Sequence, residues 1–249
     1  MLSGLFYSTT IFSFASMSFF RNWYDKVTTN WQQAFADEGF RRYFLPNFVL
    51  CFALYYMTIY WVSLNSDRAG MIITDPLYPF LPRYDFSWAI FFLTYSCTLL
   101  LLFDIAQYPF LLHRAFVAFV AVFVVRAICI HFVPLSPSPA IIPLQDPITN
   151  SLAGEGHIMN DLFFSGHVAD VTTFYLLCRN AAIRRYMFVC ICGMAFFLVC
   201  QRVHYTVDVI VAPVFSYFSY WVFVEKDLIW KPFLKKPEFE YSQDRSLAE

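Results

Sequence analysis

Two short polar clusters stand out in a sequence that is otherwise strongly apolar, and both contain residues that can do chemistry. The first cluster, DLFFSGH, ends at His167, and the second, HYTVD, begins at His204 and ends at Asp208. Two imidazoles and a carboxylate can supply a nucleophile, a general acid and a general base. Without a metal-ligand pattern beside them, these groups suit transfer of a phosphoryl-type group through a phosphohistidine.

The spacing within the second cluster suggests a role for each residue. His204 and Asp208 are four residues apart, so on a helix they would share one face, one turn apart. A carboxylate near an imidazole fixes its tautomer and stabilises the imidazolium, which makes His204 a candidate nucleophile and Asp208 its orienting partner. His167 would donate a proton to a leaving oxygen and later remove one, and Gly166 before it permits close approach of a backbone or substrate.

The composition is that of a membrane protein. Hydrophobic residues make up 59% of the 249, aromatic residues 21% and charged residues 14%, with a mean hydropathy of +0.53. A soluble globular domain has about a quarter charged residues. The net charge of −1 gives no basic footprint for nucleic acid. The seven cysteines show no metal-binding spacing, so no metal or other cofactor is expected.

The apolar residues form blocks long enough to cross a bilayer, which takes about 20 residues as a helix. We therefore predict an all-α membrane bundle of six transmembrane helices within a catalytic domain at 44–225. The expected spans are 44–64, 86–106, 112–133, 162–179, 184–201 and 205–224.

The distribution of positive charge predicts the orientation of this bundle. Of the 17 Lys and Arg residues, thirteen fall on one side, Arg68, Arg83 and Arg202 on the other, and Arg126 within a span. The positive-inside rule then predicts that both termini are cytosolic, and an odd number of spans would destroy the asymmetry. Both polar clusters open spans at the opposite end, so the active site is predicted on the exoplasmic or luminal side.

The terminal segments are expected to lie outside the bundle. Residues 1–20 are uncharged and long enough to span, but they are rich in Ser and Thr and no basic segment precedes them. We predict that 1–43 forms an interfacial region, a helix lying on the membrane and continuing into an amphipathic stretch with Trp and Tyr anchors. Residues 226–249 are predicted to be a polar cytosolic tail.

The two clusters together resemble the sphingomyelin synthase family, a branch of the type 2 phosphatidic acid phosphatase superfamily. The family's third motif reads approximately GDYLYSGHT and its fourth HYTVDV. The matching residues here are Asp161, Ser165, Gly166 and His167, followed by His204, Tyr205, Thr206, Val207, Asp208 and Val209. FFSGHVA is also similar to plant phosphatidylcholine:diacylglycerol cholinephosphotransferases. The strong resemblance covers 161–210, about a fifth of the chain.

This resemblance implies a transferase that moves a phosphocholine- or phosphoethanolamine-type headgroup from a glycerophospholipid to ceramide or diacylglycerol. It implies that His204 attacks phosphorus, that Asp208 assists it, and that His167 handles the protons. Residues expected to bind the substrate are Asp161, Ser165, Gly166, Arg126 and Tyr205. Asp161 would meet a choline or ethanolamine amine, with aromatic help from neighbours such as Tyr205.

One departure bears on the substrate. The superfamily's phosphatases carry a Lys and Arg clamp, with an Arg six residues before the second His, where this chain has Leu198. A phosphate monoester has nearly two charges and needs several cationic partners. In the predicted topology only Arg126 and Arg202 are near the clusters, which favours a singly charged phosphodiester.

Two other functions stay open at this stage. A hydrolase of the phospholipase C or lipid phosphatase type would use the same His-His-Asp set with water as acceptor. A non-enzymatic scaffold or lipid transporter would keep the fold, but it would have no need of all three residues. The sequence does not fix the headgroup, the acceptor, the organelle or the oligomeric state.

Overall fold

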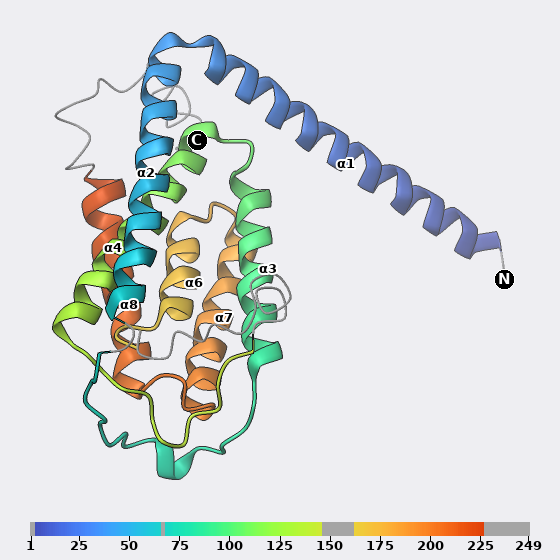
Figure 1. Ribbon diagram of the computed structural model, residues 1–249. Helices are drawn as coiled ribbons and strands as arrows, with labels where there is room; N and C mark the ends of the chain where they lie inside the picture. Colours follow the sequence, from blue (N-terminus) through green and yellow to red (C-terminus); the bar gives the residue numbers. More distant parts are fainter. Residues whose placement is uncertain (1–2, 66–67, 146–161, 227–249) are drawn as a thin grey trace.

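The computed structural model describes residues 3–65, 68–145 and 162–226, and for residues 3–17 it describes the backbone only. Within these ranges the secondary structure is helical, apart from one parallel bridge between Met71 and Leu135. The order along the chain (Figure 1) is α1 Ser3–Ala36, α2 Glu38–Asn65, the 3-10 turn η1 Tyr78–Phe80, α3 Ser87–Ile105, α4 Pro109–Phe132, α6 Gly166–Leu177, α7 Ala181–Cys200, α8 Thr206–Tyr220 and the π turn η2 Trp221–Glu225.

The helices begin where the sequence supplies suitable capping residues. Asp37 separates α1 from α2, and its Oδ1 accepts a hydrogen bond from the Phe40 N–H (3.0 Å). Pro109 is the first residue of α4, where its missing N–H costs no hydrogen bond. The Asn180 Oδ1 accepts from two N–H groups in the first turn of α7 (2.9 and 3.1 Å). Each apolar block therefore starts and stops as a separate helix.

The outer surface of the bundle is suited to lipid. Five described helices are long and apolar enough to cross a membrane, namely Glu38–Leu64, Ser87–Ile105, Pro109–Phe132, Ala181–Cys200 and Thr206–Glu225. Large apolar side chains point outward along them, including Trp88 (79% exposed) and Phe132 (76% exposed). In water such a surface would aggregate, whereas in a bilayer it contacts hydrocarbon. These features indicate a multi-pass membrane protein.

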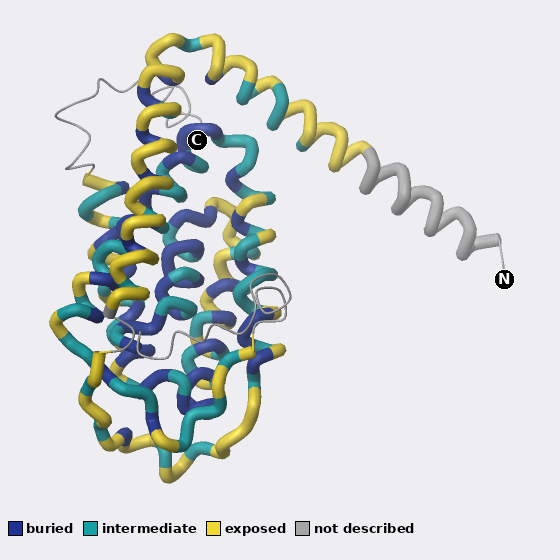
Figure 2. The backbone as a smooth tube through the Cα atoms, in the orientation of Figure 1, coloured by how far each residue is buried: buried dark blue, intermediate teal, exposed yellow. Residues whose placement is uncertain are grey.

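Helix α6 is the central element and differs from its predicted form. It packs against α3, α4, α7 and α8 (Figure 1), and most of its residues are buried, as the dark tube in Figure 2 shows. However, it has 12 residues instead of the 18 expected, so it is about 18 Å long against a hydrocarbon core of about 30 Å. The prediction of six full spans is therefore not confirmed.

The shortness of α6 leaves one end of the bundle recessed. The Asp104 carboxylate, at the end of α3, accepts hydrogen bonds from the Arg179 and Asn180 N–H groups (2.6 and 3.1 Å), just after α6. Helices α3 and α6 thus end at the same level. Because α3 has 19 residues and is about 28 Å long, α6 begins about 10 Å short of the far end of α3. We call this far end the site end and the other the α1 end.

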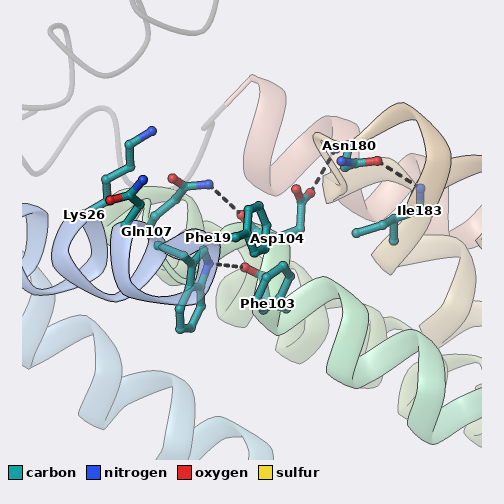
Figure 3. A pocket seen from close by; sticks show the side chains of 9 residues that line it. Phe19, Lys26, Phe103, Asp104, Gln107, Asn180 and Ile183 are labelled. Atoms are coloured by element: carbon teal, nitrogen blue, oxygen red, sulfur yellow. Dashed lines mark hydrogen bonds between the residues drawn. The ribbon is translucent and has the colours of Figure 1, made fainter. Parts of the chain in front are cut away.

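Helix α1 is an arm that crosses the α1 end of the bundle and extends beyond it (Figure 1). The Trp23 indole donates to the Phe103 carbonyl (3.1 Å) and stacks on the Phe103 ring, and the Trp31 indole donates to the Ala106 carbonyl (2.9 Å). Figure 3 shows Phe103 and Asp104 of α3 beside Phe19 and Lys26 of α1. The N-terminal segment is helical in the structure, but the predicted interfacial helix over 1–43, lying on the membrane, is not confirmed and stays a prediction.

Connections that are distant in sequence are joined to each other at the site end. The parallel bridge of Met71 and Leu135 rests on two backbone hydrogen bonds, from the Met71 N–H to the Pro134 carbonyl (2.9 Å) and from the Ser136 N–H to the Met71 carbonyl (3.0 Å). A Cβ at Gly70 would lie 2.6 Å from the Leu135 carbonyl carbon, so only glycine fits this crossing. The Gln201 side chain accepts from the Phe86 N–H (2.8 Å) and donates toward the 133–145 connection. These links hold a layer of loops over the recess.

Candidate functional site

His204 and Asp208 lie together, but not in the way that their spacing predicts. Helix α8 begins at Thr206 and Tyr205 is its extended N-cap residue, so His204 precedes the helix. Asp208 is instead the third residue of a capping box, and its Oδ2 accepts from the Tyr205 N–H (3.0 Å). This folds the carboxylate back to within 3.6 Å of the His204 Nδ1. Both side chains are buried, at 6% and 0% exposure.

The His204–Asp208 pair is close to a hydrogen bond without making one. At 3.6 Å the separation exceeds hydrogen-bond length, and neither His204 Nδ1 nor Asp208 Oδ1 has a partner among the described residues. Hydrogen bonds of catalytic groups are often long in a protein without substrate and shorten in the complex. The carboxylate also sits in the first turn of α8, where the helix dipole stabilises its negative charge.

His167 is brought to the same end of the bundle by the start of α6. The Ser165 N–H donates to the Asp208 carbonyl (3.2 Å), which links the residue before α6 to the first turn of α8. His167 follows two residues later, half-buried, with its ring in edge contact with Phe91 of α3 (5.7 Å between centroids). The two predicted histidines therefore come from segments joined by a direct backbone contact.

The start of α6 has the features of an anion-binding site. Ser165 is its N-cap residue, a position where a serine hydroxyl usually bonds to the helix's own N–H groups. Here it makes no such bond, and the fully buried Oγ has no partner among the described residues. A helix N-terminus presents N–H groups and partial positive charge, which suits a phosphate.

Arg126 places a guanidinium against this helix start. Its Nε donates to the Phe164 carbonyl (2.7 Å), and the side chain is buried. A Cβ built on Gly166 would lie 3.3 Å from the Arg126 Cζ and 3.4 Å from its Nε. Gly166 is thus the residue that lets the guanidinium approach the N-terminus of α6 closely. Asp170, one turn further along α6, lies within electrostatic range of Arg126.

Arg202, in contrast to Arg126, makes contacts that stabilise the fold. Its backbone is left-handed, with φ of 63°. Its guanidinium donates to the carbonyls of Tyr78, Leu81 and Val199, and stacks over the Tyr78 ring at 4.1 Å. Among the described residues, Arg126 and Arg202 are the buried cations. Since Arg202 is held by these carbonyls, Arg126 is the buried cation that adjoins the predicted site residues.

Tyr205 and Asp161 were also predicted to bind the substrate. The Tyr205 side chain is fully buried; its hydroxyl donates to the Ser136 carbonyl (2.9 Å) and its ring stacks on Tyr78 (5.9 Å between centroids). These contacts hold the loop layer onto α8. Asp161 lies outside the described residues, so its predicted contact with a cationic headgroup stays a prediction.

Two residues that the sequence analysis missed fix the second cluster in place. The buried Asp75 caps α8, since its carboxylate accepts from the Thr206 N–H and from the Thr206 hydroxyl (2.8 Å). The Tyr78 hydroxyl donates to the His204 carbonyl (3.2 Å). Burial, and then the nearby Asp75 carboxylate, raise the pKa of Tyr78, so the phenol keeps the proton that it donates. The sequence does not reveal these roles, because Thr206 and His204 lie more than 120 positions away from Asp75 and Tyr78.

Comparison with protein-family models gives a match for the C-terminal part of the chain. No curated protein matches this chain. Residues 160–225 match the family model described as PAP2 superfamily C-terminal. The matched segment contains His167, His204 and Asp208, together with α6, α7 and α8. The match does not distinguish the sphingomyelin synthase branch. It supports similarity to the type 2 phosphatidic acid phosphatase superfamily, and with it phosphatase- or phosphotransferase-type chemistry on phospholipids.

Proposed function

We propose that this protein is a phospholipid headgroup transferase, which moves a phospho-headgroup from a glycerophospholipid to a lipid alcohol such as ceramide or diacylglycerol. The observation that carries this proposal is the buried pair of His204 and Asp208, whose Nδ1 and Oδ2 atoms are 3.6 Å apart. A backbone hydrogen bond from Ser165 to Asp208 links this pair to α6, the helix that bears His167. The similarity to the phosphatidic acid phosphatase superfamily supports the reaction class. The membrane-spanning bundle supports a lipid substrate.

In the proposed first step, the His204 Nε2 attacks phosphorus and the bond from phosphorus to the diacylglycerol oxygen breaks. Asp208 takes the hydrogen bond from Nδ1 and stabilises the positive ring as it forms. His167 gives its proton to the departing diacylglycerol oxygen. The products are a phosphohistidine that carries the headgroup and one neutral diacylglycerol.

In the second step the acceptor's hydroxyl loses its proton to His167, and its oxygen attacks the phosphohistidine. The phosphorus–nitrogen bond breaks, His204 recovers its lone pair and His167 is again protonated. Two displacements at phosphorus give overall retention of configuration. With water in place of the lipid alcohol, the same steps describe the hydrolase alternative.

The charge of the site supports a phosphodiester as substrate. The start of α6 offers the Ser165 hydroxyl, backbone N–H groups and Arg126, a set that suits an anion of about one charge. A monoester carries nearly two charges at neutral pH and calls for more cations. Arg202 does not supply one, because carbonyl groups and the Tyr78 ring hold its guanidinium.

The proposal is tested with full-length protein reconstituted in liposomes. Fluorescent ceramide and fluorescent diacylglycerol are supplied separately, with phosphatidylcholine, phosphatidylethanolamine or phosphatidylinositol as donor. His204→Ala is the inactive variant. His131→Ala is the matched control, since His131 lies at the C-terminal end of α4, outside the predicted catalytic set.

A new phosphorylated ceramide or diacylglycerol species, present with wild type and His131→Ala and absent with His204→Ala, would support the transferase and identify both substrates. Release of water-soluble headgroup without a new lipid would replace the transferase by the hydrolase. No turnover of any donor, in wild type as in His204→Ala, would refute the enzymatic proposal and favour a scaffold or transporter.

A further inference from the structure

A second lipid-facing feature lies far from the histidine pair, near the α1 end of the bundle. It is a groove of about 330 Å³ between α2, α3 and α4, with α6 behind it. Its lining is almost entirely apolar and aromatic, and includes Phe48, Leu102, Phe116, Phe119 and Phe174. Phe48 and Leu102 are exposed on the outer surface, so the groove opens toward the lipid around the bundle.

Two polar residues, Thr98 and His113, interrupt this apolar lining, and the Thr98 hydroxyl already donates to the Thr94 carbonyl (2.8 Å). His113 of α4 lines the groove and is 2% exposed, with the rings of Tyr43, Phe44 and Phe110 within 5.0 to 6.1 Å of its own. Its Nε2 is buried and has no hydrogen-bond partner among the described residues. Leaving such a group unpaired in an apolar setting costs about 1–3 kcal/mol, which favours an occupant of the groove that supplies the partner.

The position of His113 fits the polar end of a lipid. It is the fifth residue of α4, which starts at Pro109, so it lies about 6 Å into the helix from the α1 end. The aromatic residues Phe116 and Phe119 follow deeper along the same helix, over about another 9 Å. A molecule lying along the groove would therefore meet the imidazole near the membrane surface and hydrocarbon-like surface further in.

The chemistry of an imidazole narrows the choice of occupant. In a neutral ring, Nε2 is a donor in one tautomer and an acceptor in the other. A hydroxyl group both donates and accepts, so it pairs with Nε2 in either tautomer, whereas an ester carbonyl pairs with only one. A charged phosphate headgroup would find no buried cation in this lining, which contains no Lys or Arg. We infer that this groove binds an uncharged lipid alcohol, with its hydroxyl hydrogen-bonded to His113 and its chain along Phe116 and Phe119.

This site is separate from the proposed catalytic centre and does not depend on turnover. The test uses full-length His204→Ala protein in phosphatidylcholine nanodiscs, so that no probe is converted. The probes are diazirine-bearing diacylglycerol and ceramide, each beside a deoxy analogue in which hydrogen replaces every hydroxyl group. Crosslinked peptides are mapped by mass spectrometry, which separates the groove (residues 98–119) from the histidine centre (residues 162–168 and 204–208).

The expected result is capture of at least one alcohol on the groove peptides about five-fold above its deoxy analogue, the factor for one net hydrogen bond. His113→Phe should remove this preference, and His131→Phe, on the same helix, should keep it. The diacylglycerol and ceramide arms tell which alcohol is bound. If the groove peptides of protein with the native groove sequence capture both alcohols and their deoxy analogues equally, the inference is overturned. This outcome does not depend on how the His113→Phe variant folds. A preference that survives in His113→Phe, or capture only at the histidine centre, would overturn it as well.

Discussion

Substituting Gly166 by alanine should weaken phosphate binding without lowering the stability of the fold. The new Cβ would lie 3.3 Å from Arg126 Cζ, 3.4 Å from Nε and 3.6 Å from one terminal nitrogen. Contacts at 3.3 Å are tighter than ordinary van der Waals packing, so the guanidinium must move by a few tenths of an ångström. Its 2.7 Å hydrogen bond to the Phe164 carbonyl lengthens as a result, and the cation leaves its position at the helix start.

The expected loss follows from the hydrogen bond that Arg126 would make to the reacting phosphate in the proposed mechanism. Hydrogen bonds to charged groups contribute about 1.5–3 kcal/mol, so kcat/KM for Gly166→Ala should fall about 10- to 150-fold. The fold should tolerate the change, because alanine is the better helix former by about 1 kcal/mol. The assay is headgroup transfer in liposomes, with melting of the purified protein measured in parallel.

Gly193 of α7 provides the matched control. A Cβ at Gly193 would meet side-chain carbons of Leu93 and Phe197 at 3.6 and 3.8 Å, which are ordinary contact distances. Gly193→Ala should therefore keep full activity. The reasoning is refuted if Gly166→Ala retains activity within two-fold of wild type, or if its loss of activity equals that of a variant chosen only to match its change in melting temperature.

Three further changes test other parts of the site. Asp208→Asn should lower kcat by about 10²–10⁴-fold with little change in KM, because it removes the carboxylate that stabilises the imidazolium in the proposed mechanism; steady-state kinetics with unchanged kcat would contradict this role. Asp75→Ala should cost about 1–2 kcal/mol by uncapping α8 and speed amide exchange in its first turn, whereas Asp85→Ala, which removes only a bond to the N–H of Ser87, should leave that turn unchanged. Gly70→Ala should lower the melting temperature by several degrees, since a Cβ there would lie 2.6 Å from backbone; equal melting of this variant and wild type would show that the crossing is not rigid.

The long helices could be predicted from sequence because their apolar length is a property of single segments. Helices α3, α4, α7 and α8 occupy the predicted blocks within a few residues. The short α6 was predicted too long at both ends. At its start, apolar Leu162 and Phe163 read as part of a span, whereas they form the irregular segment before the Ser165 cap. Apolar composition alone does not distinguish a helix from the buried irregular segment that precedes it.

The local geometry of the site was harder to predict. The four-residue spacing of His204 and Asp208 suggested a helical face, and that was wrong, because the N-cap falls between them. Their proximity nevertheless holds, for the different reason that Asp208 caps its own helix. Arg202 was grouped with Arg126 by its place in the sequence, but a left-handed backbone turns it toward the loop carbonyls. The anchors Asp75 and Tyr78 depend on long-range contacts, which a single sequence does not reveal.

The length of α6 also bears on how the chain enters the membrane during synthesis. Twelve residues are too few for efficient insertion as an independent span, and an aspartate such as Asp170 near the middle of a span adds about 2.5–3.5 kcal/mol to the cost of insertion. After three intervening residues comes α7, a mainly apolar helix of 20 residues, so we expect α6 to insert only together with α7, as a helical hairpin. Glycosylation reporters fused after residue 180 and after residue 204 would distinguish paired from stepwise insertion. On this view His167 stays outside the bilayer until α7 has been made, and the proposed site of His167, His204 and Asp208 forms only after the last three helices have inserted in order.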